Sequence, residues 1–371
     1  MADIYLPSFP AIAHGLNTNI QNVQFSLSIY MFGFCISQLF YGPVSDGIGR
    51  RKPMLVGLSF CFIGSILCCI SQNISTLLLG RFCQGLGAGA TLTLGSAMMR
   101  DLFEGTTLAK YGSYGASVMA IVLATAPLLG GYFQEYLGWH ATFAFLILYT
   151  LSTLLVFIFF IPETNQFLQT DNLQFKNIKQ NLYTLVTSPI FIGFATCSLL
   201  TYGAILAWLT SGPVLLEKVI GLSPVQFGWV YAIAGLAFSA GAFTNSQLVT
   251  HLGIPRMIYI GLTGMLFSGL IMLGLKWLGF MNTAVIAGPA ILLLFSCSMV
   301  FPNTSAGLFQ PFPHIAGITS ALFYSSRLLG GAVFSALIAL MPNTTQTPMA
   351  LAFITSAILS WVVFYLCQKA T

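Results

Sequence analysis

Long apolar runs separated by short clusters of charge constrain this chain more than any other feature. The runs are about 18 to 25 residues long, which is the length that a helix needs to cross the roughly 30 Å hydrocarbon layer of a bilayer. Charged residues make up 6% of the sequence and hydrophobic residues 57%, whereas about 25% of residues are charged in soluble domains. The sequence therefore predicts a membrane protein with many spans.

Polar breaks between the apolar runs predict where these spans lie. We expect them near residues 24–45, 53–71, 75–98, 110–133, 140–161, 189–211, 224–248, 256–276, 282–302, 314–340 and 348–368. The segment before them, 1–14, is too short to cross a bilayer and is expected to form the outer half of a further helix. Because a charged amino terminus inside a membrane is costly, we also expect roughly 10 or more residues upstream of it.

Basic residues predict the orientation, because cytoplasmic loops carry an excess of Lys and Arg. If the loop 46–52 is cytoplasmic, only Lys218 and Lys276 lie outside, while Arg81 and Arg327 fall within spans. The basic residues then expected on the cytoplasmic side are Arg50, Arg51, Lys52, Arg100, Lys110, Lys176, Lys179, Arg256 and Lys369. We therefore expect a cytoplasmic (inner) membrane protein with a cytoplasmic C-terminus.

Two short words recur at nearly the same spacing. Val23-Gln24-Phe25 with Gly33 returns 202 residues later as Val225-Gln226-Phe227 with Gly235, and Leu128 to Gly131 returns 200 residues later as Leu328 to Gly331. Repeats in the same membrane orientation predict two halves related by an axis along the membrane normal. The expected fold is all-α and polytopic, with six-helix bundles over 1–161 and 189–371 and a cytoplasmic linker over 162–188.

The strongest local signal is the charged turn over residues 42–52. It contains Gly42, Asp46, Gly49, Arg50 and Arg51, together with Gly47 and Lys52. Glycines at 47 and 49 permit a sharp reversal, and the carboxylate can pair with a nearby arginine. The plainer alternative is an anchor that only keeps the loop inside. This pattern resembles the motif between the second and third helices of the major facilitator superfamily.

Three further stretches extend the resemblance. They are Arg81 to Ala88, the helix motif Ala126 to Gly131 with Pro127, Gly130 and Gly131, and the opening Asp3 to Pro10. Together they resemble the Bcr/CflA group of drug:proton antiporters over essentially the whole chain. Ala126 departs from the commoner glycine before the proline, and Pro127 with its glycines is expected to bend the helix where it meets the opposite half.

Asp3 and Arg81 are the candidate proton-coupling residues. A carboxylate among apolar neighbours can exchange a proton near neutral pH, and an arginine within a span is expensive unless it is paired or hydrated. The resemblance implies that Asp3 is the protonation site and that Arg81 adjusts its protonation. The alternatives are a helix-end charge near the outer surface for Asp3 and snorkelling for Arg81.

A substrate cavity is expected where polar and aromatic residues of the spans converge. Arg327 has no carboxylate nearby in sequence, which indicates either an anionic or polar substrate group or a role in helix packing. The cavity candidates are Tyr5, Tyr30, Gln84, Tyr202, Phe323, Tyr324 and Arg327. Arg100 and Asp101 are expected to join Asp46 in a cytoplasmic charge cluster, which the resemblance implies latches one state, or to form a weak solvated pair.

Several classes of function are excluded. There is no Walker-type phosphate loop, no H-E-x-x-H and no catalytic Ser/His/Asp set, so neither an ATP-driven pump nor an enzyme is expected. Gly85, Gly87 and Gly89 lie in an apolar helix and indicate close packing. The net charge of +5 is explained by orientation rather than by nucleic acid. We expect no metal, no cofactor and a monomer in a lipid bilayer.

The sequence thus predicts a secondary transporter driven by the proton gradient. It is expected to export small hydrophobic or amphipathic molecules, such as bicyclomycin- or chloramphenicol-type antibiotics, by alternating access. Two alternatives stay open: export of a native metabolite or siderophore, and a non-transporting receptor or inactive paralogue. The second is raised by the repeat of the charged turn at 250–256, which has His251 where the first has Asp46.

Overall fold

The described residues of this computed structural model, 2–369 apart from 166–174, 313–314 and 343, contain helices and no strand. The helices are η1 (Leu6–Ser8), α1 (Phe9–Gly15), α2 (Ile20–Ile48), α3 (Arg51–Cys69), α4 (Ile74–Leu102), α5 (Gly105–Leu137), α6 (Trp139–Phe160), α7 (Phe175–Thr187), α8 (Pro189–Pro213), the π-helical η3 (Val214–Val219), α9 (Pro224–Leu252), α10 (Ile254–Trp277), α11 (Thr283–Phe309), α12 (Ala316–Leu340) and α13 (Thr347–Lys369).

Each span predicted from the apolar runs coincides with one helix, from α2 to α6 and from α8 to α13. Among the described residues, 9 helices are long and apolar enough to cross a membrane. α4 and α5 are not among the 9, although they run for 29 and 33 residues. The fold is therefore that of a multi-pass helical membrane protein, as expected.

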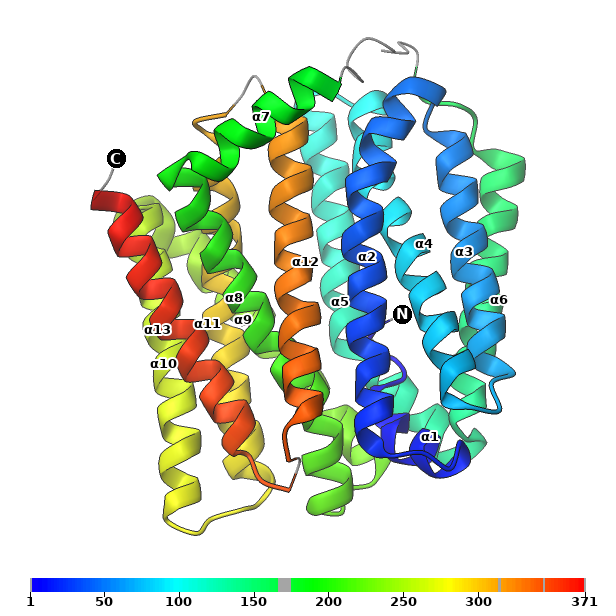
Figure 1. Ribbon diagram of the computed structural model, residues 1–371, viewed down its shortest axis with the longest axis vertical. Helices are drawn as coiled ribbons and strands as arrows, with labels where there is room; N and C mark the ends of the chain where they lie inside the picture. Colours follow the sequence, from blue (N-terminus) through cyan, green and yellow to red (C-terminus); the bar gives the residue numbers. More distant parts are fainter. Residues whose placement is uncertain (1, 166–174, 313–314, 343, 370–371) are drawn as a thin grey trace.

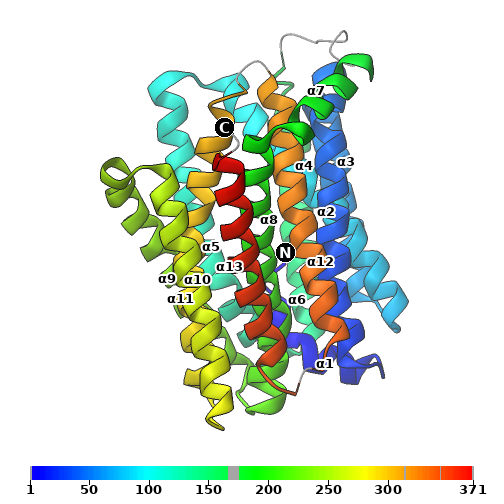
Figure 2. The ribbon, with the colours of Figure 1, turned by 60° about the vertical axis from the view of Figure 1, so that its left-hand side comes forward.

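The helices form two sets that stand side by side (Figure 1). The N-terminal set runs from η1 to α6 and the C-terminal set from α8 to α13, while α7 lies across one end of the molecule. We call this end the α7 end and the opposite one, where α1 and η3 lie, the α1 end. The sets meet where α2 packs on α12 and where α5 packs on α9. Within the C-terminal set, α8 lies beside α12 and α13 (Figure 2).

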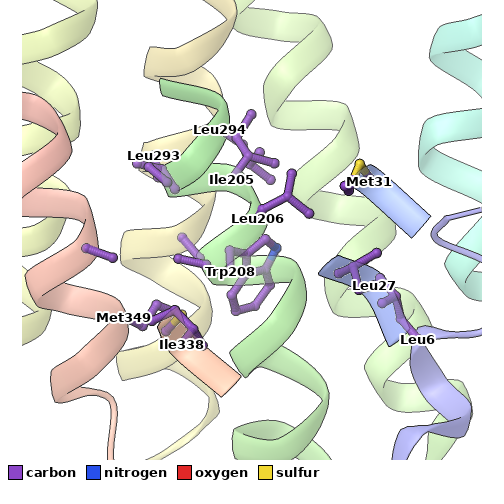
Figure 3. Packing of buried hydrophobic residues seen from close by; sticks show 14 of the residues in the cluster. Leu6, Leu27, Met31, Ile205, Leu206, Trp208, Leu293, Leu294, Ile338 and Met349 are labelled. Carbon is purple, nitrogen blue, oxygen red and sulfur yellow. The ribbon is translucent and has the colours of Figure 1, made fainter. Parts of the chain in front are cut away.

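One hydrophobic core joins the two sets. Leu27 and Met31 of α2 belong to the same buried cluster as Leu206 and Trp208 of α8 (Figure 3). Leu6 of η1 is buried in it too. The short segment predicted ahead of the first full span is thus helical only from Leu6 to Gly15. Its Phe9 and Ile12 are buried in the core, whereas His14 at its end is exposed.

Glycines let the helices approach closely, as expected for Gly85, Gly87 and Gly89. A methyl group added at Gly87 would lie 2.7 Å from the backbone nitrogen of Cys61 on α3, and one added at Gly85 would lie 3.0 Å from that of Phe34 on α2. Real side chains do not tolerate such distances. The three glycines therefore fix how closely α2, α3 and α4 pack.

The charged turn differs from its prediction in one respect. Gly49 has φ of +91°, which favours glycine, but Gly47 lies within α2 and does not have a positive φ. The helix continues to Ile48, so one glycine makes the reversal. The equivalent turn between α9 and α10 has Gly253 with φ of +81°. The backbone repeat is preserved although the charges are not.

The two sets pack tightly near the α1 end. An added methyl group at Gly228 of α9 would lie 2.8 Å from the Cα of Leu128, and one at Gly235 would lie 3.0 Å from that of Ala124. Between 104 and 123, by contrast, every residue whose side chain is described, except Leu108, is exposed. Among the described side chains, the first half of α5 is therefore packed much less than the second half.

Candidate functional site

Arg81 of α4 is fully buried in the N-terminal set. Its Nη1 donates to Oε1 of Gln84 at 2.6 Å, and the Gln84 amide donates in turn to the hydroxyl of Ser65 on α3 at 2.9 Å. The residues three apart on one helix face the same side, as predicted for Gln84. The polar chain fixes the orientation of the guanidinium.

Two tyrosine rings pack against this guanidinium. Its central carbon lies 4.0 Å from the ring centre of Tyr5 and 4.4 Å from that of Tyr30 on α2. The Tyr5 hydroxyl shares a 3.0 Å hydrogen bond with that of Ser26. Cations are attracted to aromatic faces at such distances, most strongly where water is excluded. The structure thus gathers three candidates, Tyr5, Tyr30 and Gln84, around Arg81.

Asp3 begins the segment that leads into η1. Two residues further on, the Tyr5 ring stacks on Arg81, which brings Asp3 into the neighbourhood of that arginine. η1 itself contacts α5 of the N-terminal set and both α8 and α9 of the C-terminal set. The segment that carries Asp3 is therefore placed between the two sets, near the arginine with which the resemblance paired it.

Arg327 of α12 lies on the other side of the interface. Its guanidinium carbon lies 3.6 Å from the ring centre of Phe301 on α11 and 5.1 Å from that of Tyr202 on α8. The Tyr202 hydroxyl reaches the Met31 sulfur of α2 at 3.8 Å. Arg327 is half-buried, and its aromatic contacts come from α8 and α11.

The other aromatic candidates are placed differently. The Tyr324 ring lies 6.4 Å from that of Phe309 on α11 and 5.2 Å from that of Phe323. Phe323 also packs against Phe309, 6.0 Å between ring centres, in a cluster with Leu185 of α7. Phe323 thus lies near the α7 end and away from Arg81.

Polar contacts between the sets add residues that the sequence did not single out. The Gln24 amide of α2 donates to the carbonyl of Thr210 on α8 at 2.7 Å. Near the α1 end, the carboxylate of Glu135 on α5 accepts from the backbone nitrogen of Val225 on α9 at 3.0 Å. Both residues lie near helix ends, where polar side chains are common, so the sequence did not mark them as functional. Their hydrogen-bond partners become visible only when the two sets are packed together.

The helix motif of α5 lies at this junction too. Gly130 touches the carbonyl of Ile4, and an added methyl group at Gly131 would lie 3.0 Å from the carbonyl carbon of Pro224. Pro127 is buried within α5. The motif therefore brings the start of the chain, α5 and α9 into contact, as predicted for a meeting with the opposite half.

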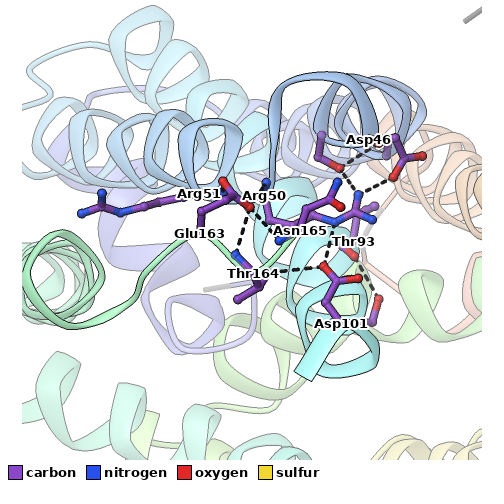
Figure 4. A network of polar contacts seen from close by, with 11 residues as sticks. Asp46, Arg50, Arg51, Thr93, Asp101, Glu163, Thr164 and Asn165 are labelled. Atoms are coloured by element: carbon purple, nitrogen blue, oxygen red, sulfur yellow. Dashed lines mark hydrogen bonds and ion pairs between the residues drawn. The ribbon is translucent and has the colours of Figure 1, made fainter. Parts of the chain in front are cut away.

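The charged turn forms a network at the α7 end (Figure 4). Arg50 donates from Nη1 to Asp46 at 2.5 Å and from Nε to Asp101 of α4 at 3.1 Å. Arg100, which was expected in this cluster, is exposed, and it takes no part in the two ion pairs that the described residues form here. Gly42 lies in ordinary contact with Thr93 of α4, 3.8 Å from an added methyl group. Asp46, Arg50 and Asp101 thus tie α2 to α4.

Glu163 completes the network, although the sequence placed it only at the start of the linker. Its carboxylate accepts from the backbone nitrogens of Arg50 at 2.8 Å and Arg51 at 3.0 Å, and Arg51 donates to the carbonyl of Ile158 at 2.6 Å. Desolvation raises the pKa of Glu163, but four backbone hydrogen bonds outweigh it and lower that pKa below its ordinary value. The turn is thereby fastened to the end of α6.

Metal chemistry has no support in the part of the chain that the structure describes. No group of three His, Cys, Asp or Glu side chains there can hold an ion. The cysteines form no disulfide in the described part of the chain and are mostly buried within helices, as packing residues are.

Charged groups buried between two packed sets of membrane helices are characteristic of a solute pathway. The class of protein that this fold and site define is a membrane transporter. The model of the Major Facilitator Superfamily matches residues 1–335, and the chain belongs to that family.

Relatives within this family include proteins named for drug resistance. The chain is 28% identical to a bicyclomycin resistance protein homolog of Haemophilus influenzae, over 98% of this chain and 91% of the relative. It is also 28% identical to a chloramphenicol resistance protein of Pseudomonas aeruginosa, over 96% and 84%. The resemblance to the Bcr/CflA group is thus confirmed. A D-xylose-proton symporter, 15% identical, shares the fold with a TM-score of 0.77 over 97% of this chain and 93% of the symporter.

Proposed function

We propose that this protein is a proton-coupled exporter of small hydrophobic or amphipathic molecules in the cytoplasmic membrane, with a cytoplasmic C-terminus and no cofactor. The observation that carries the proposal is the placement of Asp3 beside the buried Arg81, between the two sets of helices. A carboxylate there can alternate between pairing with the arginine and carrying a proton.

Competition between proton and substrate supplies the coupling. Ionised Asp3 neutralises the charge of Arg81. When Asp3 is protonated, the guanidinium is stabilised by Tyr5, Tyr30 and Gln84 alone. A substrate that occupies the space beside Tyr5 and Tyr30 favours one of these two forms. If the substrate binds better when Asp3 is ionised, bound substrate lowers the affinity of Asp3 for the proton. By linkage, a bound proton then lowers the affinity for the substrate by the same factor.

The moving parts are the two sets, joined by the linker that contains α7. The contacts of α5 with α9 and of α2 with α12 are the surfaces on which they rock. Tight packing of α5 on α9 near the α1 end, together with the exposed first half of α5, supports a state that is open to the cytoplasm. The network of Arg50, Asp46, Asp101 and Glu163 lets the N-terminal set move as a unit.

Charge and aromatic surface define the substrate class. The charged residues of the site are Arg81, Arg327 and Asp3, whose carboxylate interacts electrostatically with Arg81. Aromatic rings pack against both arginines. This setting favours neutral or anionic aromatic molecules over cations. The names of the bicyclomycin and chloramphenicol resistance relatives support neutral antibiotics as first probes.

The test is efflux from proteoliposomes under an imposed pH gradient. Wild-type protein is expected to move chloramphenicol or bicyclomycin against its gradient. The Asp3→Asn variant is expected to bind the drug without gradient-driven movement, whereas the exposed carboxylate variant Glu104→Gln should behave as wild type. Binding without transport by the wild type would favour a receptor, and undiminished flux in Asp3→Asn would move the coupling to another group.

A further inference from the structure

The final turns of α8 at the α1 end are π-helical. η3 (Val214–Val219) continues α8 and contacts α1 of the N-terminal set, as well as α9 and α11. A π-helical stretch is rare and occurs most often at functional sites. This one places Glu217 where the two sets meet.

One oxygen of the Glu217 carboxylate lies in an apolar setting. Its residue is half-buried, but Oε1 is shielded from solvent and has no hydrogen-bond partner in the described part of the chain. The neighbouring Val214, Leu215 and Leu216 are buried hydrophobic residues. An ionised carboxylate is costly without partners, whereas a protonated one is much less so.

Tyr231 of α9 is a titratable group close to the start of η3. An added methyl group at Gly212, two residues before η3, would overlap the Tyr231 hydroxyl. The ring is held in place, because its hydroxyl donates to the Trp208 carbonyl at 3.1 Å and it stacks on the Trp208 indole at 4.7 Å. Tyr231 therefore lies where α8, η3 and α9 meet.

The other elements around η3 offer little charge. α1 contains His14, which is exposed, and the adjacent Lys218 is exposed as well. α11 contains no Asp, Glu, Lys, Arg, His or Tyr. The carboxylate thus lacks a cation that could stabilise its ionised form in this closed arrangement.

We propose that Glu217 is a second proton-binding residue, which takes up a proton as the α1 ends of the two sets close over it and returns that proton to the solution when they part. The proton adds to a carboxylate oxygen from water at the α1 end and leaves to the same water. Closure and protonation are therefore linked. This rests on the proposed proton-coupled cycle, but it concerns a different carboxylate and a conformational step.

Spin-label distances across the α1 end test the proposal. In a variant without native cysteines, Tyr136→Cys on α5 and Trp277→Cys on α10 provide exposed labelling positions, one on each set. In nanodiscs without substrate, we expect the distance to be short at low pH and a longer distance to appear as the pH rises. Glu217→Gln, which mimics the protonated form, should lose the long-distance population, and Lys218→Gln should keep it.

Further variants separate this claim from others. Glu217→Asp keeps a titratable group and should keep a pH-dependent distance, so it replaces Glu217→Gln if the latter does not fold. Asp3→Asn should lose gradient-driven export yet keep a pH-dependent distance. A wild-type pH response in Glu217→Gln would overturn the inference and leave the export proposal standing. A third outcome is also possible: Glu217→Gln loses the pH response while the wild-type protein exports no drug. That result would support the inference about Glu217 and overturn the export proposal.

Discussion

The guanidinium carbon of Arg81 lies 4.0 Å from the centre of the Tyr5 ring. A cation in the fourth span is thereby held by an aromatic residue near the beginning of the chain. The contact couples the position of Asp3, two residues before Tyr5, to that of Arg81. The coupling site therefore depends on how the segment around η1 is packed.

Tyr5→Leu should weaken this site more than Tyr5→Phe. The phenylalanine keeps the ring over Arg81 and loses the hydrogen bond to Ser26, whereas leucine removes a cation–π contact that contributes about 0.5–2 kcal/mol. We expect the affinity for chloramphenicol to fall by roughly twofold to thirtyfold in the leucine variant. Isothermal titration of both variants measures this, and equal affinities would show that the ring face does not hold the guanidinium.

Arg327→Gln should change the preference of the site for charge. A positive residue stacked on Phe301 attracts anions, and its hydrogen bonds to a charged group contribute about 1.5–3 kcal/mol. We expect an anionic aromatic probe to bind roughly tenfold more weakly to the variant, with a smaller loss for a neutral analogue. The exposed Arg100→Gln is the matched control. An equal loss for both probes would instead indicate a packing role.

Gly49→Ala should destabilise the protein more than Gly253→Ala. Both glycines have a φ that costs other residues on the order of 1–3 kcal/mol. At Gly49 the added methyl group would also lie 2.7 Å from the carboxyl carbon of Glu163, whereas nothing lies within 4 Å at Gly253. Unfolding in detergent by increasing amounts of denaturant compares them. Equal losses would mean that the Glu163 contact adds no constraint.

Glu163 should make stability depend on pH. Because its pKa is lowered below the ordinary 4.5, its stabilising contribution is present above that pH and is lost as the pH falls through the lowered value. We expect Glu163→Gln to have a lower melting temperature than the wild type at pH 7. On acidification, the melting temperature of the variant should fall by less than that of the wild type. Parallel melting curves at all pH values would contradict the role of its backbone hydrogen bonds.

The sequence was most informative where one residue type was out of place. Arg81 and Arg327 were identified because arginines are rare inside apolar spans, and the structure places each against aromatic rings of its own set. The spans themselves followed from the lengths of the apolar runs. Their partners across the interface, such as Thr210 for Gln24, depended on which faces meet, and the apolar pattern does not encode this when helices are apolar on every side.

Two acidic residues escaped notice for a simpler reason. Glu163 stands at the start of a polar stretch and Glu217 precedes Lys218 at the end of a span, where charges are ordinary. Only the folded backbone reveals that Glu163 accepts hydrogen bonds from Arg50 and Arg51, and that a π-helical turn buries an oxygen of Glu217. Gly47 was likewise predicted in the turn because the sequence does not mark the residue at which α2 ends.

Proton release on drug binding tests the central claim most directly. In weakly buffered detergent solution, adding chloramphenicol to the wild-type protein should release up to about one proton per bound drug, because substrate and proton compete at Asp3. Asp3→Asn should bind the drug and release none. Drug binding by the wild type without any proton release across the pH range would contradict the account.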